Sequence, residues 1–321
     1  MTLTVSSKKN SRPSILIIGG PTASGKSEMA LDLAEFFGGV IINADSMQVY
    51  REIKLLSASP LPKHEMQIPH RLYGILSARE KFSVALWRDM ALQEIRSARE
   101  HDLLPIFVGG TGLYLRSLVH GLASIPTIPS HIRKTAILLR EELGATKFYD
   151  LLLTRDPEGM SKIHPRDSQR VIRAFEVLEA TGKSLQYWQR LHVQPDDLIE
   201  EVAVLILRPA RGELYEACDK RAKTIASVGG IEEVKNLLKL GLNSSSPAMK
   251  ALGVREFSDF INGIIDLEIA VSRFCKSTRN YAKRQSTWFR NQMPDANMLD
   301  KRYDKHERYR IIDLVKNMLA R

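Results

Sequence analysis

The chain has few cysteines, no long apolar run and no concentration of glycine or proline. Its only cysteines among 321 residues are Cys218 and Cys275, which excludes a disulfide framework and a cysteine-based zinc site, so we expect a cytoplasmic protein. No uncharged apolar stretch reaches the roughly 18 residues that a membrane span needs, and the polar first residues lack the apolar segment of a secretory signal. With 44% hydrophobic residues the chain is not disordered. We expect a soluble globular monomer without a membrane partner.

Acidic residues are outnumbered by basic ones. Lysine and arginine total 47 against 37 aspartate and glutamate, a formal net charge of +10. Such a surplus suggests an anionic partner, and nucleic acid is the first candidate, although bulk charge alone is weak evidence. The length suggests roughly two domains.

Short β-branched runs alternate with longer amphipathic segments near the N-terminus. Strands are predicted at residues 14–18, 40–42, 103–108 and 202–207, and helices at 28–37, 84–99, 232–240, 267–280 and 305–319. This alternation is typical of βαβ units around a parallel sheet. Between the third and fourth predicted strands the periodicity is helical, after a proline-containing linker, ASIPTIPSHI. We therefore predict a tail at 1–13, an α/β core at 14–122 and 198–321, and an all-helical insertion at 123–197.

Residues 17–27 read IIGGPTASGKS, which places Gly20, Gly25, Lys26 and Ser27 in the phosphate-loop pattern G-x-x-x-x-G-K-[ST] between a strand and a helix. Glycines allow backbone N–H groups to turn toward phosphate oxygens, and the helix adds its positive end. Lys26 would reach the terminal phosphate, and the Ser27 hydroxyl would bind Mg²⁺. The predicted core is therefore a P-loop NTPase-like parallel sheet flanked by helices. The loop does not by itself name the phosphate compound.

Many P-loop hydrolases carry a metal-binding acid at the end of an apolar strand, and in this sequence such an acid follows a different strand. The third predicted strand ends in Gly109, Gly110 and Thr111, whereas the second ends at Asp45. Because ligands lie beyond the carboxyl ends of parallel strands, Gly20, Asp45 and Thr111 should line one crevice. Asp45 could instead cap a following helix.

The segment HPRDSQRVIRAFEVLEATGKS predicts a helix from about Asp167 to Thr181. Its arginines at 166, 170 and 173 fall away from the apolar stripe. They could meet phosphates, or they could pair with Asp167 and Glu176 at spacings of three. The sequence leaves these alternatives open.

Residues 269–294 contain no acid. Six basic residues share this stretch: Arg273, Lys276, Arg279, Lys283, Arg284 and Arg290. Four aromatic residues are interleaved with them: Phe274, Tyr281, Trp288 and Phe289. Such a pattern suits RNA with unstacked bases. The alternative is a helix with core aromatics and solvated charges.

Taken together, these segments resemble the tRNA dimethylallyltransferase family, also called tRNA isopentenyltransferases. The resemblance covers about residues 14–292. Its motifs are GGPTASGKS (19–27), INADSMQVY (42–50), VGGTGLYLRSL (108–118), HPRDSQRVIRAFEVLEATGKSL (164–185), ALGVREF (251–257) and YAKRQSTWF (281–289). Their order and spacing are specific as a set.

The resemblance implies transfer of a dimethylallyl group from dimethylallyl diphosphate to N6 of the adenosine 3′ of the anticodon, in tRNAs that read codons beginning with U. Asp45 would be the general base, and Thr111 would help to position the amino group. Mg²⁺ at Ser27 would assist the departing diphosphate. The adenosine would have to be flipped out of its stack to react.

The same resemblance assigns binding residues. The diphosphate would contact Gly20, Pro21, Thr22, Ala23, Ser24, Gly25, Lys26, Ser27 and Arg221. The tRNA anticodon stem-loop would contact Asp45, Ser46, Met47, Gln48, Thr111, Arg133, Gln169, Arg170, Val171, Ile172 and Arg173. Val254 departs from the family pattern, in which many relatives carry an aromatic residue, so an RNA contact there is in doubt.

Two other functions fit parts of the sequence. A P-loop nucleotide or small-molecule kinase would use the phosphate loop, but it would not need the acid-free basic stretch. The other is an RNA-binding adaptor with a vestigial phosphate site, but that function would leave the positions of Asp45 and Thr111 at the strand ends as a coincidence.

Overall fold

The computed structural model describes residues 15–191, 198–199 and 201–319, so the predicted tail lies outside the described residues. The chain forms two compact units: a core unit, residues 1–119 with 196–321, and a helical unit, residues 120–195. The boundaries of the helical unit lie within three residues of the predicted insertion, 123–197.

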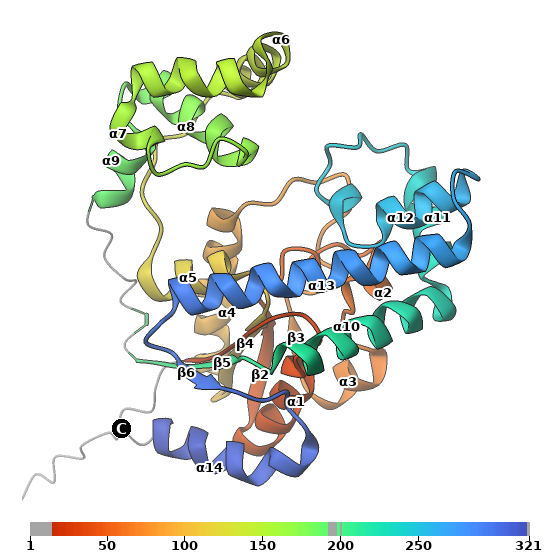
Figure 1. The fold of residues 1–321 in the computed structure, drawn as a ribbon. Coiled ribbons are helices and arrows are strands. Elements are labelled where there is room, and N and C mark those ends of the chain that lie inside the picture. Colours follow the sequence, from red (N-terminus) through yellow and green to blue (C-terminus); the bar gives the residue numbers. More distant parts are fainter. Residues whose placement is uncertain (1–14, 192–197, 200, 320–321) are drawn as a thin grey trace, which may run out of the picture. The chain divides into compact units, whose positions relative to one another are not determined.

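A wholly parallel sheet of six strands forms the centre of the core unit (Figure 1). The strand order is β3-β2-β4-β1-β5-β6. The strands are β1 (Ile15–Gly19), β2 (Gly39–Asn43), β3 (His70–Arg71), β4 (Leu104–Gly109), β5 (Val202–Leu207) and β6 (Asn297–Leu299). The predicted α/β class is confirmed, as are the four strands that belong to its centre. The two short edge strands β3 and β6 were not predicted.

Helices account for most of the remaining core unit. They are α1 (Lys26–Phe37), α2 (Lys54–Ser57), α3 (Pro62–Gln67), α4 (Val84–Glu100), α5 (Gly112–His120), α10 (Arg211–Ile225), α11 (Ile231–Lys239), α12 (Val254–Ile261), α13 (Leu267–Gln292) and α14 (Arg308–Leu319). Helix α13 was predicted to end at residue 280 but continues to Gln292. In the described part of the chain, no helix combines the length and the apolar character that crossing a membrane requires.

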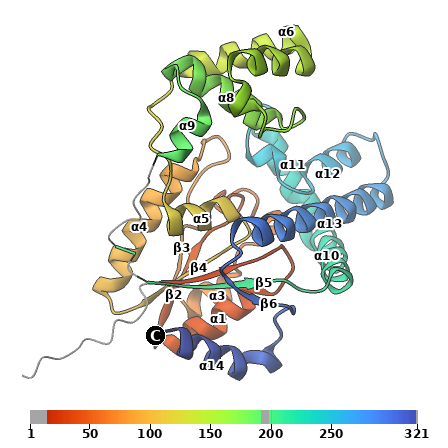
Figure 2. The same ribbon diagram turned by 60° about the vertical axis from the view of Figure 1, so that its left-hand side comes forward.

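Helices cover both faces of the sheet (Figures 1 and 2). Successive side chains of a strand point to opposite faces. Ile17 accordingly belongs to a core with Trp87 of α4, and Ile18 belongs to a second core with Met29 of α1. Burial on both faces explains why the central strands are continuous apolar runs.

The helical unit consists of α6 (Ser130–Arg155), α7 (Pro157–Met160), α8 (Ser168–Thr181) and α9 (Leu185–Arg190). Its small core includes Phe148 and Phe175. Helix α8 begins where the side chain of Asp167 accepts a hydrogen bond from Arg170 N at 3.2 Å, and it ends at Gly182, whose φ is 65°. These are an N-cap and a left-handed C-cap, and they confirm the predicted helix.

Candidate active site

The phosphate loop connects β1 to α1 in a conformation that only glycine accommodates at two positions. Gly20 has a φ of 142°, and an added Cβ would lie 2.7 Å from Leu207 O. Gly25 has a φ of 92°, and its Cβ would lie 2.8 Å from Tyr303 O. Helix α1 begins at Lys26, so its first amides have no acceptor within the helix. The loop therefore presents backbone donors and the positive end of a helix dipole.

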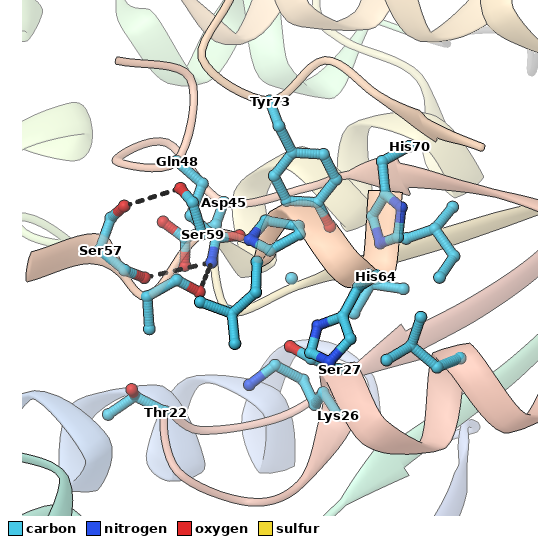
Figure 3. Close-up of a pocket in the computed structure, with 18 of the residues that line it drawn as sticks. Thr22, Lys26, Ser27, Asp45, Gln48, Ser57, Ser59, His64, His70 and Tyr73 are labelled. Atoms are coloured by element: carbon cyan, nitrogen blue, oxygen red, sulfur yellow. Dashed lines mark hydrogen bonds between the residues drawn. The ribbon is translucent and has the colours of Figure 1, made fainter. Parts of the chain in front are cut away.

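A cavity of about 250 Å³ adjoins this loop (Figure 3). Thr22, Lys26 and Ser27 contribute the loop side, and Asp45 and Gln48 contribute the segment after β2. The remaining walls come from Leu31, Ile41, Ser57, Ala58, Ser59, Pro60, Leu61, His64, His70, Tyr73, Val108, Gly109, Gly110 and Arg221. The predicted loop residues outside this lining are Gly20, Pro21, Ala23, Ser24 and Gly25, which shape the loop. The structure thus brings Asp45 and the phosphate loop to one cavity.

Two cations and one carboxylate share the cavity. Lys26 Nζ donates to Pro21 O at 2.6 Å, and Arg221 donates to Ser57 O at 3.2 Å. Burial lowers the pKa of the Lys26 ammonium to about 7, while the nearby Asp45 carboxylate acts in the opposite direction. Burial also lowers the pKa of the Arg221 guanidinium, again opposed by Asp45. A bound anion would offset the cost of this desolvation, because it supplies a counter-charge to Lys26 and Arg221 and so favours their charged forms.

Asp45 and Thr111 belong to one hydrogen-bonded turn. Asp45 Oδ1 accepts from Met47 N at 2.9 Å, which closes a local turn. No helix follows until α2, so the alternative of a helix cap is wrong. Thr111 Oγ1 accepts from Ser46 N at 2.9 Å and donates to Ser46 Oγ at 3.2 Å. Thr111 therefore holds the Asp45 turn against the end of β4 and does not itself line the cavity.

A short segment after α2 forms a wall that the sequence did not reveal. Gln48 Nε2 donates to Ser57 O at 3.1 Å and to Ala58 O at 2.8 Å. The carboxylate of Glu233 on α11 accepts from Leu55 N and Leu56 N, both at 2.8 Å. Glu233 lies far away in the sequence, so only the tertiary fold shows that it supports this wall.

Another wall carries aromatic and imidazole side chains to which sequence reasoning gave no role. Figure 3 shows Tyr73 and His70 side by side, with His64 between them and Ser27. Burial lowers the pKa of both imidazoles and raises that of the Tyr73 phenol. All three groups are therefore neutral near pH 7. A neutral wall thus lies beside the cationic loop.

Three arginines of the helical unit that were predicted to contact tRNA are paired with acids. Arg133 and Arg173 both contact the buried carboxylate of Glu176, at 2.8 and 3.0 Å, and Arg170 lies 3.4 Å from Asp167. The predicted pairs at spacings of three therefore form. The Arg170–Asp167 pair is exposed on both sides, so it does not prevent Arg170 from meeting a phosphate. Arg133 and Arg173 together carry one more charge than the Glu176 carboxylate that they share.

The other predicted contacts in α8 differ in exposure. Gln169 is exposed and Ile172 is half-buried. Val171, however, is only 2% exposed and packs in the core of the helical unit. The apolar stripe of α8 takes the side chain of Val171 inward, so the predicted tRNA contact at this position would have to be made by its backbone.

The aromatic residues of the acid-free stretch are not all available for stacking. Phe274 and Phe289 are buried in two different cores, whereas Tyr281 and Trp288 are half-buried. The expectation of four stacking surfaces is therefore corrected to two. Val254 is also buried, which leaves its side chain no route to RNA.

Acids from neighbouring helices neutralise part of this stretch. Arg279 contacts Asp219 of α10 at 2.6 Å, and Arg273 lies 3.7 Å from Asp259 of α12. The stretch contains no acid of its own, but acids from other helices balance these two arginines. Exposed basic residues nevertheless remain, and Lys283 and Arg284 line a groove of about 480 Å³ together with Trp288.

Known proteins are similar to this chain in sequence and in fold. The family described as IPP transferase matches residues 48–292. A tRNA dimethylallyltransferase of Rhodospirillum centenum is 47% identical over 286 residues, which is 89% of this chain and 91% of that protein. One of Rhodopseudomonas palustris is 45% identical, covering 87% and 89% of the two chains.

Solved structures agree with the sequence comparison. The tRNA isopentenylpyrophosphate transferase of Bacillus halodurans superimposes with a TM-score of 0.69 at 30% identity, over 95% of this chain and 96% of that one. A eukaryotic dimethylallyltransferase acting on tRNA gives a TM-score of 0.76 at 25% identity, over 94% and 79%. The chain belongs to the IPP transferase family, and both curated relatives described above are named tRNA dimethylallyltransferase.

Proposed function

We propose that this protein transfers a dimethylallyl group from dimethylallyl diphosphate to N6 of the adenosine 3′ of the anticodon, in tRNAs that read codons beginning with U. The observation that carries the proposal is the single cavity in which the phosphate loop meets Asp45. Strand β4 ends in Gly109 without an acid, which does not favour the alternative of a P-loop kinase. The family membership also does not favour it.

The donor diphosphate would occupy the cationic side of the cavity. Lys26, Arg221 and the first amides of α1 would offset the charge that grows on the bridging oxygen as the bond to carbon breaks. Among the described residues no three His, Cys, Asp or Glu side chains form a metal cage. The exposed Ser27 hydroxyl nevertheless fits Mg²⁺, which typically takes few protein ligands together with phosphate oxygens. When bound, Mg²⁺ would supply further charge stabilisation to the leaving group.

The acceptor would react beside Asp45. The N6 lone pair forms a bond to the allylic carbon, the carbon–oxygen bond breaks, and its electron pair leaves with the diphosphate. The proton released from N6 passes to the Asp45 carboxylate, which acts as general base. Thr111 would keep the Asp45 turn in place through Ser46. The base must leave its stack to enter the cavity.

The tRNA would contact Asp45, Ser46, Met47, Gln48 and Thr111 of the core unit, and Arg133, Gln169, Arg170, Ile172 and Arg173 of the helical unit. The arginines are supported by their exposure and charge, Gln169 is supported by its exposure, and all of these contacts are supported by the family resemblance. The contacts of the helical unit form a separable part of the proposal, because none of these residues lines the cavity in which the transfer takes place.

The decisive experiment measures the mass of an RNA product. We would incubate the wild-type protein with Mg²⁺, dimethylallyl diphosphate and an anticodon stem-loop, and measure the mass of the RNA by mass spectrometry. We expect the gain of one prenyl group. A parallel reaction with ATP in place of the prenyl donor tests the kinase alternative, and phosphorylation there without prenylation in the first would refute the proposal.

Arg170→Ala should weaken binding of the anticodon stem-loop and reduce the salt dependence of its affinity by about 1 in the log–log slope, the value for one phosphate contact. Arg310→Ala is a matched control. Both arginines are about two-thirds exposed and sit in pairs at spacings of three, 66% for Arg170 with Asp167 and 63% for Arg310 with Glu307. Fluorescence anisotropy at several salt concentrations measures both slopes. Equal slopes for the two variants would contradict the contact.

A further inference from the structure

Gln285 is a buried polar residue in the middle of α13 that the proposed chemistry does not yet use. It is 6% exposed and lies on the same helix face as Ala282 and Phe289, both buried. It belongs to the YAKRQSTWF motif, whose basic and aromatic residues were considered for RNA, whereas the glutamine was not. Burying an amide costs free energy unless both of its ends are hydrogen-bonded, so its partners indicate what it does.

Both ends of the Gln285 carboxamide are bonded to backbone groups in the wall of the cavity. Oε1 accepts from Thr22 N at 2.8 Å, and Nε2 donates to Gly110 O at 2.9 Å. A backbone N–H can only donate and a carbonyl can only accept, so these partners fix the orientation of the amide. Thr22 belongs to the phosphate loop, and Gly110 follows strand β4. One side chain therefore joins two segments that are far apart in the sequence.

Gln285 approaches the backbone at position 110 so closely that only glycine fits there. A Cβ at position 110 would lie 2.1 Å from Gln285 Nε2 and 3.4 Å from Asp45 Oδ2. The amide thus lies within a few ångströms of the Asp45 carboxylate. From Gly110 the connection continues to Thr111, whose hydroxyl accepts from Ser46 N.

We propose that Gln285 is a positioning residue for prenyl transfer, holding the diphosphate-binding loop at a fixed distance from the Asp45 turn. This inference rests on the proposed function, because the distance matters only if the two sides bind the two reactants. Displacing reacting groups by about 1 Å can cost a factor of 10² in rate. A purely apolar contact at this position would fill the space but would not set the distance.

Two substitutions of Gln285 separate positioning from packing. Gln285→Leu keeps much of the volume and removes both hydrogen bonds. Gln285→Glu keeps the shape and the acceptor for Thr22 N, and it loses the donor to Gly110 O while its carboxyl is ionised. When protonated, that carboxyl donates again. Burial and the neighbouring Asp45 favour the protonated form, whereas Lys26 and Arg221, which line the same cavity, favour the ionised form.

Thr278→Val is the matched control. Thr278 is buried on α13, and its hydroxyl donates only to Phe274 O of the same helix, at 2.8 Å. We expect it to turn over within twofold of wild type at temperatures where it is folded.

The experiment measures single-turnover transfer to an anticodon stem-loop at saturating dimethylallyl diphosphate, between pH 6 and pH 8. Gln285→Leu should be slower than wild type by about 10- to 100-fold, on the scale expected for misplaced reactants, with stem-loop affinity within twofold. The rate of Gln285→Glu, divided by that of wild type, should rise severalfold as the pH falls. Loss of packing alone would not produce that rise.

The outcomes separate the two proposals. A wild-type protein that adds no prenyl group refutes the proposed function. If wild type does transfer the group, then a Leu variant within threefold of its rate refutes the role of Gln285, and so does a Glu variant that keeps the wild-type rate at a pH where its carboxyl is ionised. Should the Leu variant not fold, the Glu variant alone decides, because it keeps the size and shape of the native side chain.

Discussion

Asp45→Asn is expected to slow prenyl transfer by at least about 10²-fold, the usual scale for loss of a general base. The amide oxygen of asparagine can still accept from Met47 N, the bond that Asp45 Oδ1 accepts in the native turn. The turn should therefore keep its shape, while the side chain can no longer take the proton from N6. The rate loss would then report proton transfer and not local unfolding.

The measurement is single-turnover transfer together with stem-loop affinity. Affinity should fall far less than rate, because one side chain contributes a small part of a large contact. Asp259→Asn is the control: the Asp259 side chain is 26% exposed, lies near Arg273 and does not line the cavity. Near-native turnover by Asp45→Asn would show that another group, or solvent, accepts the proton.

The sequence predicted those parts of the site that depend on local patterns. The phosphate loop is contiguous, and its glycine spacing is set by backbone conformations at Gly20 and Gly25 that other residues rarely adopt. The position of Asp45 followed from the rule that strand ends meet at one edge of a parallel sheet. Helix α8 carries both of its caps in its own sequence, so its bounds were predictable as well.

The parts that the sequence did not predict depend on contacts between distant residues. Glu176 accepts a hydrogen bond from Arg133, which lies 43 residues away in the sequence. Asp219 accepts one from Arg279, which lies 60 residues away. Neither pairing leaves a local pattern. Helix α13 was predicted to end at residue 280 because the prediction covered only its first half. Its second half packs through Gln285, which bonds to the phosphate loop, and through Phe289, which lies in a core with the sheet. Strands β3 and β6 are too short to produce a period.

Roles and positions also differ in how well sequence predicts them. Thr111 was expected to line the crevice, and it lies next to it, holding Ser46. His64, His70 and Tyr73 line the cavity although their spacing matches no metal or catalytic pattern. Burial makes this wall more strictly neutral, since desolvation lowers the pKa of the two imidazoles. Burial is a consequence of the tertiary fold, and the spacing of these residues in the sequence does not predict it.

Lys26→Met should reduce kcat/KM for dimethylallyl diphosphate by about 10² to 10³-fold, the range found when a preorganised group that stabilises developing charge is removed. Methionine keeps most of the length of the side chain. It removes the ammonium group, which donates a hydrogen bond to Pro21 O in the native loop. Because the charge on the diphosphate is greatest as the carbon–oxygen bond breaks, kcat should fall in addition to any rise in KM.

Direct binding separates the two effects. Calorimetry with inorganic diphosphate and Mg²⁺ should show weaker binding to Lys26→Met, while anisotropy shows unchanged affinity for the stem-loop. Lys316→Met, which removes an exposed lysine paired with Asp313 on α14, should match wild type in all three measurements. Arg221 remains in the variant cavity, so part of the affinity for diphosphate should survive. A Lys26→Met enzyme with native kcat would mean that Arg221 and the loop amides alone stabilise the leaving group, and that the lysine serves the structure of the loop.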